Sequence, residues 1–189
     1  MAHGERRFQG EADRLRAPER IELLEVPRVV RRCLAGQDLA TALDVGTGTG
    51  VFAEAFAASK LRVAGIDPNP VLLERARALV PAASFTEGVA ENLPFPDASF
   101  DLVFLGLVLH ETDDPARALA EARRVTTRRV AILEWPYVSE EKGPPLGDRL
   151  DPSRIEALAA AAGFSRVERV PLSHLELFLC EAAPGDPRF

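Results

Sequence analysis

Short apolar segments alternate with helix-length segments along most of this 189-residue chain. The pattern predicts strands at 40–45, 61–66, 84–87, 100–105 and 129–134, with helices at 50–59, 70–80 and 115–125 between them. A helix at 152–162 and an antiparallel pair at 167–170 and 174–180 complete the series. Strands that alternate with helices favour a mostly parallel sheet covered on both faces. Ligands of such sheets bind beyond the carboxyl ends of the strands, so we expect the functional residues there.

The chain divides into one main domain and two short flanking segments. Residues 1–36 are expected to form a helical extension or lid, 37–182 the domain itself, and 183–189 a tail. A helix over 18–35 contains Pro27, which predicts a kink or a break. The longest apolar run, 102–109, is too short to span a membrane. The polar first residues do not resemble a secretory signal, so we expect a cytoplasmic protein.

Charge and cysteine content exclude further classes of protein. The net charge of −6 does not resemble the basic footprint of a nucleic-acid binder. The arginines near 117–129 are better interpreted as a solvated helix face. Cys33 and Cys180 stand apart without a CxxC motif, so we expect two ordinary buried thiols and no bound metal.

The segment after the first strand carries the strongest chemical pattern. Three alternate glycines connect this strand to the next helix, and an aspartate precedes them; the residues concerned are Asp44, Gly46, Thr47, Gly48 and Gly50. Glycine tolerates positive φ and lets a ligand lie against the backbone. The helix that follows presents free N–H groups to an anion. We therefore expect the turn to hold an anionic group, with Asp44 available for an ammonium group.

Two alternatives remain open for this turn. It can be a tight turn whose glycines serve geometry alone. It can also be a dinucleotide site of an NAD(P)-binding oxidoreductase, because 48–53 fits the G-x-G-x-x-A fingerprint. Against the second alternative, an acidic residue stands two positions before the first glycine. In addition Tyr137, the only tyrosine, is followed four residues later by Glu141 and not by lysine.

Asp67 ends the second strand, 17 positions after Gly50. A carboxylate at this place can accept two hydrogen bonds from ribose hydroxyls. The alternative is an aspartate that caps the following helix. The glycine turn favours ribose binding.

The ordered motifs resemble the class I S-adenosylmethionine (SAM)-dependent methyltransferases. The resemblance rests on the glycine turn, Asp67, the segment 90–95 and the segment 99–101, and it is greatest to the methyltransferase type 11 group, which includes the ubiquinone and menaquinone C-methyltransferases. It implies a Rossmann-like, doubly wound α/β fold with a mostly parallel seven-stranded sheet and an antiparallel last strand. It also implies SAM as the cofactor of domain 37–182.

The resemblance assigns further residues to the cofactor. Gly46, Gly48 and Gly50 would contact its methionine end, and Asp67 its ribose. The remaining assignments are Pro68 and Asn69 beside the adenine, Ala90 and Glu91 along its edge, and Leu105 and Gly106 beneath the sulfonium. The family often has aspartate before the Ala–Glu pair, where this chain has Val89, so a side-chain contact to the adenine is not implied there.

Candidates for the acceptor side follow the fourth and fifth strands. His110 and Glu111 follow one, and Glu134 ends the other. Methyl transfer needs a deprotonated nucleophile in line with the methyl group, and a histidine has a suitable pKa for a base. A histidine bound only to local backbone, and a glutamate paired with an arginine, are the alternatives.

The acceptor is expected to be a small, partly apolar molecule. The segment 135–150 has the length of a lid, with Trp135, Tyr137 and Val138 as an apolar wall and Phe8 and Leu15 as anchors from the other side. The expected protein is a monomer or a homodimer that transfers methyl groups and binds no nucleic acid. A SAM-binding protein without turnover is the alternative that the glycine turn does not distinguish.

Overall fold

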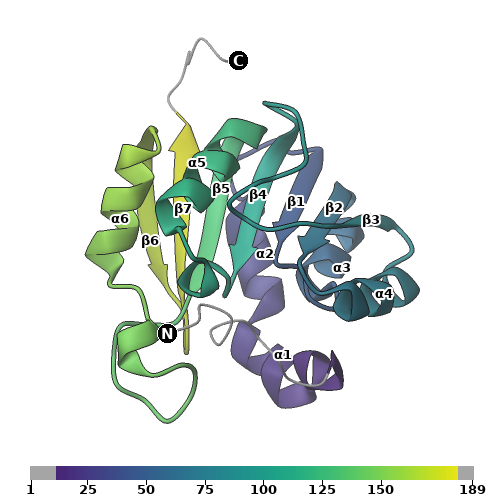
Figure 1. Cartoon of the computed structure of the whole chain (residues 1–189), viewed down its shortest axis with the longest axis horizontal. Helices are drawn as coiled ribbons and strands as arrows, with labels where there is room; N and C mark the ends of the chain where they lie inside the picture. The colour runs from purple at the N-terminus through teal and green to yellow at the C-terminus, as the bar shows by residue number, and fades with distance from the viewer. Residues whose placement is uncertain (1–11, 183–189) are drawn as a thin grey trace.

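The computed structural model describes residues 12–182, which build one central sheet with helices on both faces (Figure 1). The sheet has seven strands in the order β3-β2-β1-β4-β5-β7-β6. The strands are β1 (Thr41–Val45), β2 (Arg62–Asp67), β3 (Ala83–Glu87), β4 (Phe100–Gly106), β5 (Thr126–Glu134), β6 (Phe164–Pro171) and β7 (Glu176–Ala182). The helices are α1 (Pro18–Leu24), α2 (Val26–Leu34), α3 (Val51–Ala58), α4 (Pro70–Leu79), α5 (Pro115–Val125) and α6 (Pro152–Ala161). Three short 3₁₀ turns are η2 (Ala12–Arg16), η3 (Leu109–Glu111) and η4 (Leu146–Asp148).

The directions of the strands confirm the predicted topology. The strands β3, β2, β1, β4 and β5 pair in parallel, and β7 runs antiparallel to both β5 and β6. The strand order reverses direction between β1 and β4, which leaves a crevice at their carboxyl ends. The doubly wound sheet with an antiparallel last strand is therefore confirmed.

Strand β4 shows how one segment serves two cores. Leu102 and Phe104 pack into the core on one face, beneath α2, α3 and α4. Val103 and Leu105 pack into the core on the other face, beneath α5 and α6. This alternation follows from the two-residue period of a strand, and a strand buried on both faces has the continuous apolar sequence observed here.

The predicted helix over 18–35 is two helices, and the break lies before Pro27. Glu25 ends α1 in the left-handed conformation, with φ at 45°, and also precedes α2. Pro27 then occupies the first turn of α2, where proline lacks no necessary hydrogen bond. The proline thus begins a helix and does not kink one.

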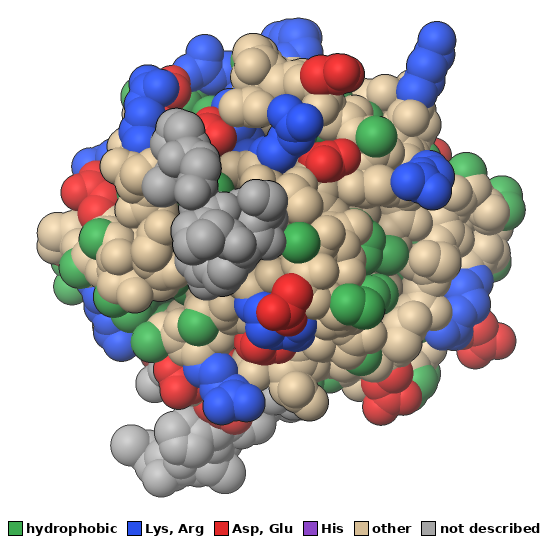
Figure 2. Space-filling view, turned by 90° about the horizontal axis from the view of Figure 1, so that it is seen from above, with side chains coloured by type: hydrophobic (Ala, Val, Ile, Leu, Met, Phe, Trp, Pro, Cys, Tyr) green, Lys and Arg blue, Asp and Glu red, His purple; other side chains and the backbone are tan. Residues whose placement is uncertain are grey.

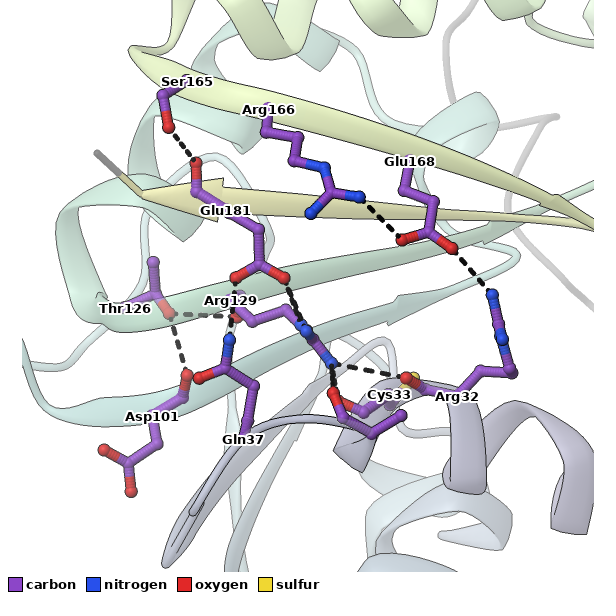
Figure 3. Close-up of polar contacts among 11 residues, drawn as sticks. Arg32, Cys33, Gln37, Asp101, Thr126, Arg129, Ser165, Arg166, Glu168 and Glu181 are labelled. Atoms are coloured by element: carbon purple, nitrogen blue, oxygen red, sulfur yellow. Dashed lines mark hydrogen bonds and ion pairs between the residues drawn. The ribbon is translucent and has the colours of Figure 1, made fainter. Parts of the chain in front are cut away.

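Arg129 attaches α2 to the sheet (Figure 3). Its guanidinium donates to the backbone oxygens of Arg32, Cys33 and Ala35, which lie at the carboxyl end of α2. The same group donates to the Glu181 carboxylate on β7, at 2.8 and 2.5 Å. One buried cation therefore joins α2, β5 and β7.

Other element boundaries differ from prediction by a few residues. β5 begins at Thr126 and not at 129, because Thr126 and Thr127 bond back to the backbone around β4 through their hydroxyls. β6 begins at Phe164, directly after the helix that Gly163 ends with φ at 92°. Cys33 and Cys180 are buried free thiols. Among residues 12–182 no helix has the length and apolarity to cross a membrane.

Candidate functional site

A cavity of about 820 Å³ opens where β1, β2, β4 and β5 end. Such a volume is within the range of pockets that hold cofactors and drug-sized ligands. It is lined by the glycine turn after β1, the residues after β2, the segment 88–91, η3 and parts of the segment that follows β5. The expectation that the motifs meet at the carboxyl ends of the strands is thus met.

The glycine turn is held in one conformation by the strand beside it. Gly46, Gly48 and Gly50 have φ values of 66°, 55° and 80°. The Thr47 amide donates to the Ile66 carbonyl at 2.8 Å. A Cβ atom on Gly46 would lie 2.1 Å from a methyl group of Val108, so only glycine fits at that position.

Asp44 supports this turn from below. Its Oδ2 accepts hydrogen bonds from the Thr47 hydroxyl at 2.7 Å and from the Ala53 amide at 3.0 Å. Burial raises the pKa of the Asp44 carboxyl to about 7, although these two bonds oppose the shift. A charged partner such as an ammonium group would therefore find a carboxyl that titrates close to neutral pH.

The hydroxyl of Thr49 indicates that a polar ligand fits the turn. It lines the cavity with 1% of its surface exposed, and its hydroxyl has no hydrogen-bond partner among the described residues. A buried hydroxyl without a partner is costly, so a ligand with polar groups at this place would satisfy it. The turn and its hydroxyl therefore fit the carboxylate and ammonium of a methionine group.

Asp67 fixes two turns while it faces the cavity. Its Oδ2 accepts from the Gly48 amide at 2.9 Å, and its Oδ1 accepts from the Asn69 amide at 2.8 Å. The cap of α4 is Asn69, whose side chain accepts from the Val71 and Leu72 amides. Helix capping by its side chain therefore does not explain Asp67, whose carboxylate lies at the cavity wall.

The proposed adenine side lies beside this aspartate. Pro68, Asn69, Ala90 and Glu91 all line the cavity, together with Val89. The Glu91 carboxylate accepts from the Asp113 amide at 2.9 Å, which ties this side to the loop after η3.

Two of the cofactor candidates, Gly50 and Leu105, are not among the residues that line the cavity. Gly50 completes the glycine turn with φ at 80°, whereas Leu105 points away from the cavity. Its side chain is fully buried in the core beneath α5 and α6. The next residues of the chain line the cavity instead, namely Gly106, Leu107 and Val108. Leu107 has φ at 60°, a left-handed backbone that is costly for leucine and that turns the chain sharply at the end of β4. The strand therefore ends one residue later than predicted.

The three acceptor-side candidates form one cluster. His110 Nδ1 lies 2.7 Å from Glu134 Oε2, and the His110 amide donates to Glu134 Oε1 at 3.1 Å. His110 Nε2 lies 3.9 Å from Glu111 Oε1. Because a carboxylate only accepts, Glu134 places the Nδ1 hydrogen on the imidazole and leaves Nε2 for the cavity.

The charge state of His110 follows from its neighbours. Burial by itself would lower the pKa of the imidazole, but the neighbouring carboxylates, with Glu134 first among them, together outweigh burial and raise it. Glu111 and Asp148 act in the same direction. An imidazole held by a buried carboxylate is a suitable group to take up a proton near neutral pH.

The segments expected to cover the site do so in part. Leu15 lines the cavity, and Arg16 donates to the Thr49 carbonyl at 2.9 Å. Phe8 lies outside the described residues. Of the predicted apolar wall only Trp135 lines the cavity, whereas Tyr137 and Val138 are 42% and 47% exposed.

Arg149 explains the shape of the segment after β5. Its guanidinium donates to three backbone oxygens of that segment, those of Pro136, Lys142 and Pro144. The segment therefore folds around a buried arginine and turns Gly143, Pro144 and Pro145 toward the cavity.

Residues 1–36 are expected from the sequence to form a helical extension or lid, but the sequence does not single out the residues by which α1 reaches the cavity. Arg20 and Leu24, four residues apart on one helix face, both line the cavity. Their spacing was visible within the predicted helix, but nothing in the sequence says which part of the molecule that face meets.

Comparison with known proteins supports this assignment. Residues 43–132 match the family model described as "Methyltransferase domain". A demethylmenaquinone methyltransferase of Deinococcus radiodurans is 38% identical over 141 residues, which are 68% of this chain and 58% of that protein. A malonyl-[acyl-carrier protein] O-methyltransferase of Serratia marcescens is 39% identical over 91 residues, 44% of this chain and 35% of the other. The chain thus spans only about half of the length of such relatives, or less.

Solved structures share the fold over nearly the whole chain. A SAM-dependent methyltransferase from Aquifex aeolicus has a TM-score of 0.79 at 23% identity. The match covers 97% of this chain and 100% of the Aquifex chain. The [4+2]-cyclase SpnF has a TM-score of 0.68 at 24% identity, and the match covers 86% of this chain and 65% of SpnF. The family and these neighbours imply SAM as the cofactor. Residues 43–132 thus carry a methyltransferase domain by their matched sequence, and the strand order and glycine turn of the chain resemble those of Rossmann-like SAM-dependent methyltransferases.

Proposed function

We propose that this protein transfers the methyl group of SAM to a small, partly apolar acceptor, and that His110 removes the acceptor's proton. One observation carries the proposal: the cofactor cradle lines the same cavity as His110, whose imidazole is held from behind by the buried Glu134. When bound, SAM supplies an electrophilic methyl group on its sulfonium. The residues of the chain bind the cofactor, orient the acceptor and remove the acceptor's proton.

Each residue has a role that its position supports. The glycine turn and Thr49 bind the methionine end, with Asp44 available to the ammonium group. Asp67 binds the ribose, while Pro68, Asn69, Ala90 and Glu91 border the adenine. Gly106, Leu107 and Val108, which line the cavity where β4 ends, would border the methyl group, with Leu107 and Val108 in place of the buried Leu105.

His110 performs the proton step in this proposal. Glu134 holds the Nδ1 hydrogen, so Nε2 accepts the proton that the acceptor loses as its bond to the methyl carbon forms. Glu111, 3.9 Å from Nε2, stabilises the imidazolium that results. A positioned base contributes typically ~10²–10⁴-fold to such a reaction, beyond the gain from positioning itself.

The nature of the acceptor follows from the cavity and the surface. The cavity walls away from the cofactor cradle include Leu24, Trp135 and Pro144, which favour an apolar body. On the face seen in Figure 2, acidic and basic side chains are interspersed over the described part, without the broad basic area that nucleic acid requires. A monomer or homodimer in the cytoplasm remains our expectation, to be tested by sedimentation and cell fractionation.

The experiment has two stages. Titration calorimetry with SAM, S-adenosylhomocysteine and NAD identifies the cofactor class, and tight binding of NAD alone would reject the proposal in favour of an oxidoreductase. Labelled SAM is then incubated with cell extract to find a labelled acceptor.

The role of His110 is tested on that acceptor. We expect His110→Ala to lower turnover by ~10²-fold or more and to leave SAM affinity within about two-fold. His174→Ala is the matched control, because His174 is exposed in the turn before β7 and does not line the cavity. SAM binding without any labelled product would instead indicate a SAM-binding protein without turnover.

A further inference from the structure

Arg20 is the only lysine or arginine among the described residues that line the cavity. The other charged side chains at the wall are acidic: Asp44, Asp67 and Glu91 on the cofactor side, and Glu111 and Asp148 on the acceptor side. The cavity thus has one cationic side chain and five carboxylates. The cation lies on α1, against Trp135, on the side where we place the acceptor.

The guanidinium of Arg20 is only partly supplied with partners. Its carbon lies 5.8 Å from the centre of the Trp135 ring, a distance typical of a cation–π contact. No hydrogen bond joins this guanidinium to another described side chain or carbonyl, although the group carries five N–H donors. Burial lowers the pKa of Arg20, and attraction to Glu111 opposes that shift.

Arg149 contacts the same tryptophan ring but, unlike Arg20, has hydrogen-bond acceptors for its guanidinium. It lies 5.6 Å from the centre of the same Trp135 ring, and it donates to three backbone oxygens. Arg149 therefore holds together the segment that lines the cavity with Gly143, Pro144 and Pro145. Arg20 has the same stacking contact and none of these acceptors, so its donors remain for a ligand.

The ligand in question is not the cofactor. The methionine end of the cradle is already reached by Arg16, whose guanidinium binds the Thr49 carbonyl and Glu54. Arg20 lies one helical turn further along the chain, against Trp135, and Trp135 directly follows the Glu134 that holds His110. Its donors therefore belong to the end of the cavity where we place the acceptor.

We propose that Arg20, stacked on Trp135, binds a carboxylate of the methyl acceptor through its planar pair of N–H donors. This inference rests on the proposed function and narrows it to acceptors with an anionic planar group at one end and a nucleophilic atom near His110. A guanidinium fork matches a carboxylate in two parallel hydrogen bonds, and a lysine in its place would not. Leu24, on the same face of α1, contributes to the apolar wall between the two ends.

Matched pairs of acids and amides test this site without a known acceptor. The protein is first saturated with S-adenosylhomocysteine, with its affinity measured by calorimetry. Ligand-observed NMR then gives the affinity for benzoate, phenylacetate and 3-phenylpropionate and for the three corresponding primary amides. We expect at least one acid to bind about ten-fold more tightly than its amide, since hydrogen bonds to charged groups are the stronger ones.

Two variants of Arg20 and one control complete the test. Arg20→Gln should abolish the preference for the acid, and Arg20→Lys should reduce it several-fold, with S-adenosylhomocysteine affinity within about two-fold of the parent in both. Arg31→Gln, an exposed arginine on α2 away from the cavity, should leave the preference intact.

The outcomes separate this inference from the proposed function. If S-adenosylhomocysteine does not bind the parent protein, the proposed function itself fails. If it binds but no acid is preferred, or if the preference survives in Arg20→Gln, the carboxylate site is wrong. A large loss of S-adenosylhomocysteine affinity in Arg20→Gln would assign Arg20 to the cofactor and also overturn the inference.

Discussion

Replacement of Glu134 by glutamine tests the centre of the proposed site. Both carboxylate oxygens of Glu134 are in use: Oε1 accepts from the His110 amide, and Oε2 accepts from His110 Nδ1 and, at 3.3 Å, from the Trp135 amide. Glutamine has the same shape but only one accepting oxygen. In either orientation of its amide, the NH₂ group faces an N–H that has no other acceptor.

The expected loss of stability follows from these contacts. A buried donor left without a partner costs ~1–3 kcal/mol, and a hydrogen bond to a charged group contributes ~1.5–3 kcal/mol. Glu134 is 1% exposed and His110 is 8% exposed, so water does not replace the lost contacts. We expect Glu134→Gln to lower the free energy of unfolding by ~3 kcal/mol at pH 6, near the ~3–5 kcal/mol typical when one partner of a buried pair is removed.

The stability lost in Glu134→Gln should depend on pH. The folded-state pKa of His110 is raised, so the stability that this pair contributes is fully present below the ordinary histidine pKa of ~6.5 and is lost as pH rises through the folded value. The difference between parent and Glu134→Gln should therefore shrink from pH 6 to pH 9. The pKa of the His110 imidazole should also fall in the variant.

Urea unfolding at several pH values and NMR titration of the histidine rings provide both readouts. Glu168→Gln is the control, because Glu168 is 40% exposed and pairs with Arg32 and Arg166 at the surface, where such pairs contribute less than ~1 kcal/mol. A loss below ~1 kcal/mol in Glu134→Gln, or a His110 that titrates at the same pH in both proteins, would refute the coupling described here.

Three further predictions concern the cradle and the fold. Asp67→Ala should weaken SAM binding by about ten-fold or more in calorimetry, because the ribose contacts and the bond to the Gly48 amide are lost together; unchanged affinity contradicts the ribose assignment. Burial raises the folded-state pKa of Asp44 to about 7, above the ~4 of an unfolded aspartate, so the free protein should lose stability as pH rises from ~4 to about 7 and should change little from this group above that. Binding of SAM should release a proton and tighten over the same range. Calorimetry in buffers of different ionisation enthalpy counts that proton, and a count of zero at pH 6 argues against an ammonium contact. Arg129→Met should lower the free energy of unfolding by ~3–5 kcal/mol in urea, because it leaves the Glu181 carboxylate without its partner. The double variant Arg129→Met, Glu181→Leu should lose less than Arg129→Met alone. Equal losses in the two variants would show that the Arg129–Glu181 pair does not contribute.

The sequence by itself determined the order of the elements and indicated which residues form the proposed cofactor side of the site. Apolar runs of strand length, together with the glycines and prolines at their ends, predict the alternation because local periodicity and turn chemistry are properties of neighbouring residues. The turn from Asp44 to Gly50 and the aspartate at 67 could be interpreted for the same reason. Both lie directly after a predicted strand, and parallel strands bring their carboxyl ends to one edge.

Only the tertiary structure decided how distant segments meet. It joins His110 to Glu134 across 24 positions of sequence, and it replaces Leu105 by the residues that follow it. It turns Tyr137 and Val138 outward, because Arg149 gathers the carbonyls of their segment around its own side chain. It also places Arg20 against Trp135, more than a hundred positions away. Such contacts depend on how helices pack on a sheet, and helical spacing shows which residues share a face but not what that face meets.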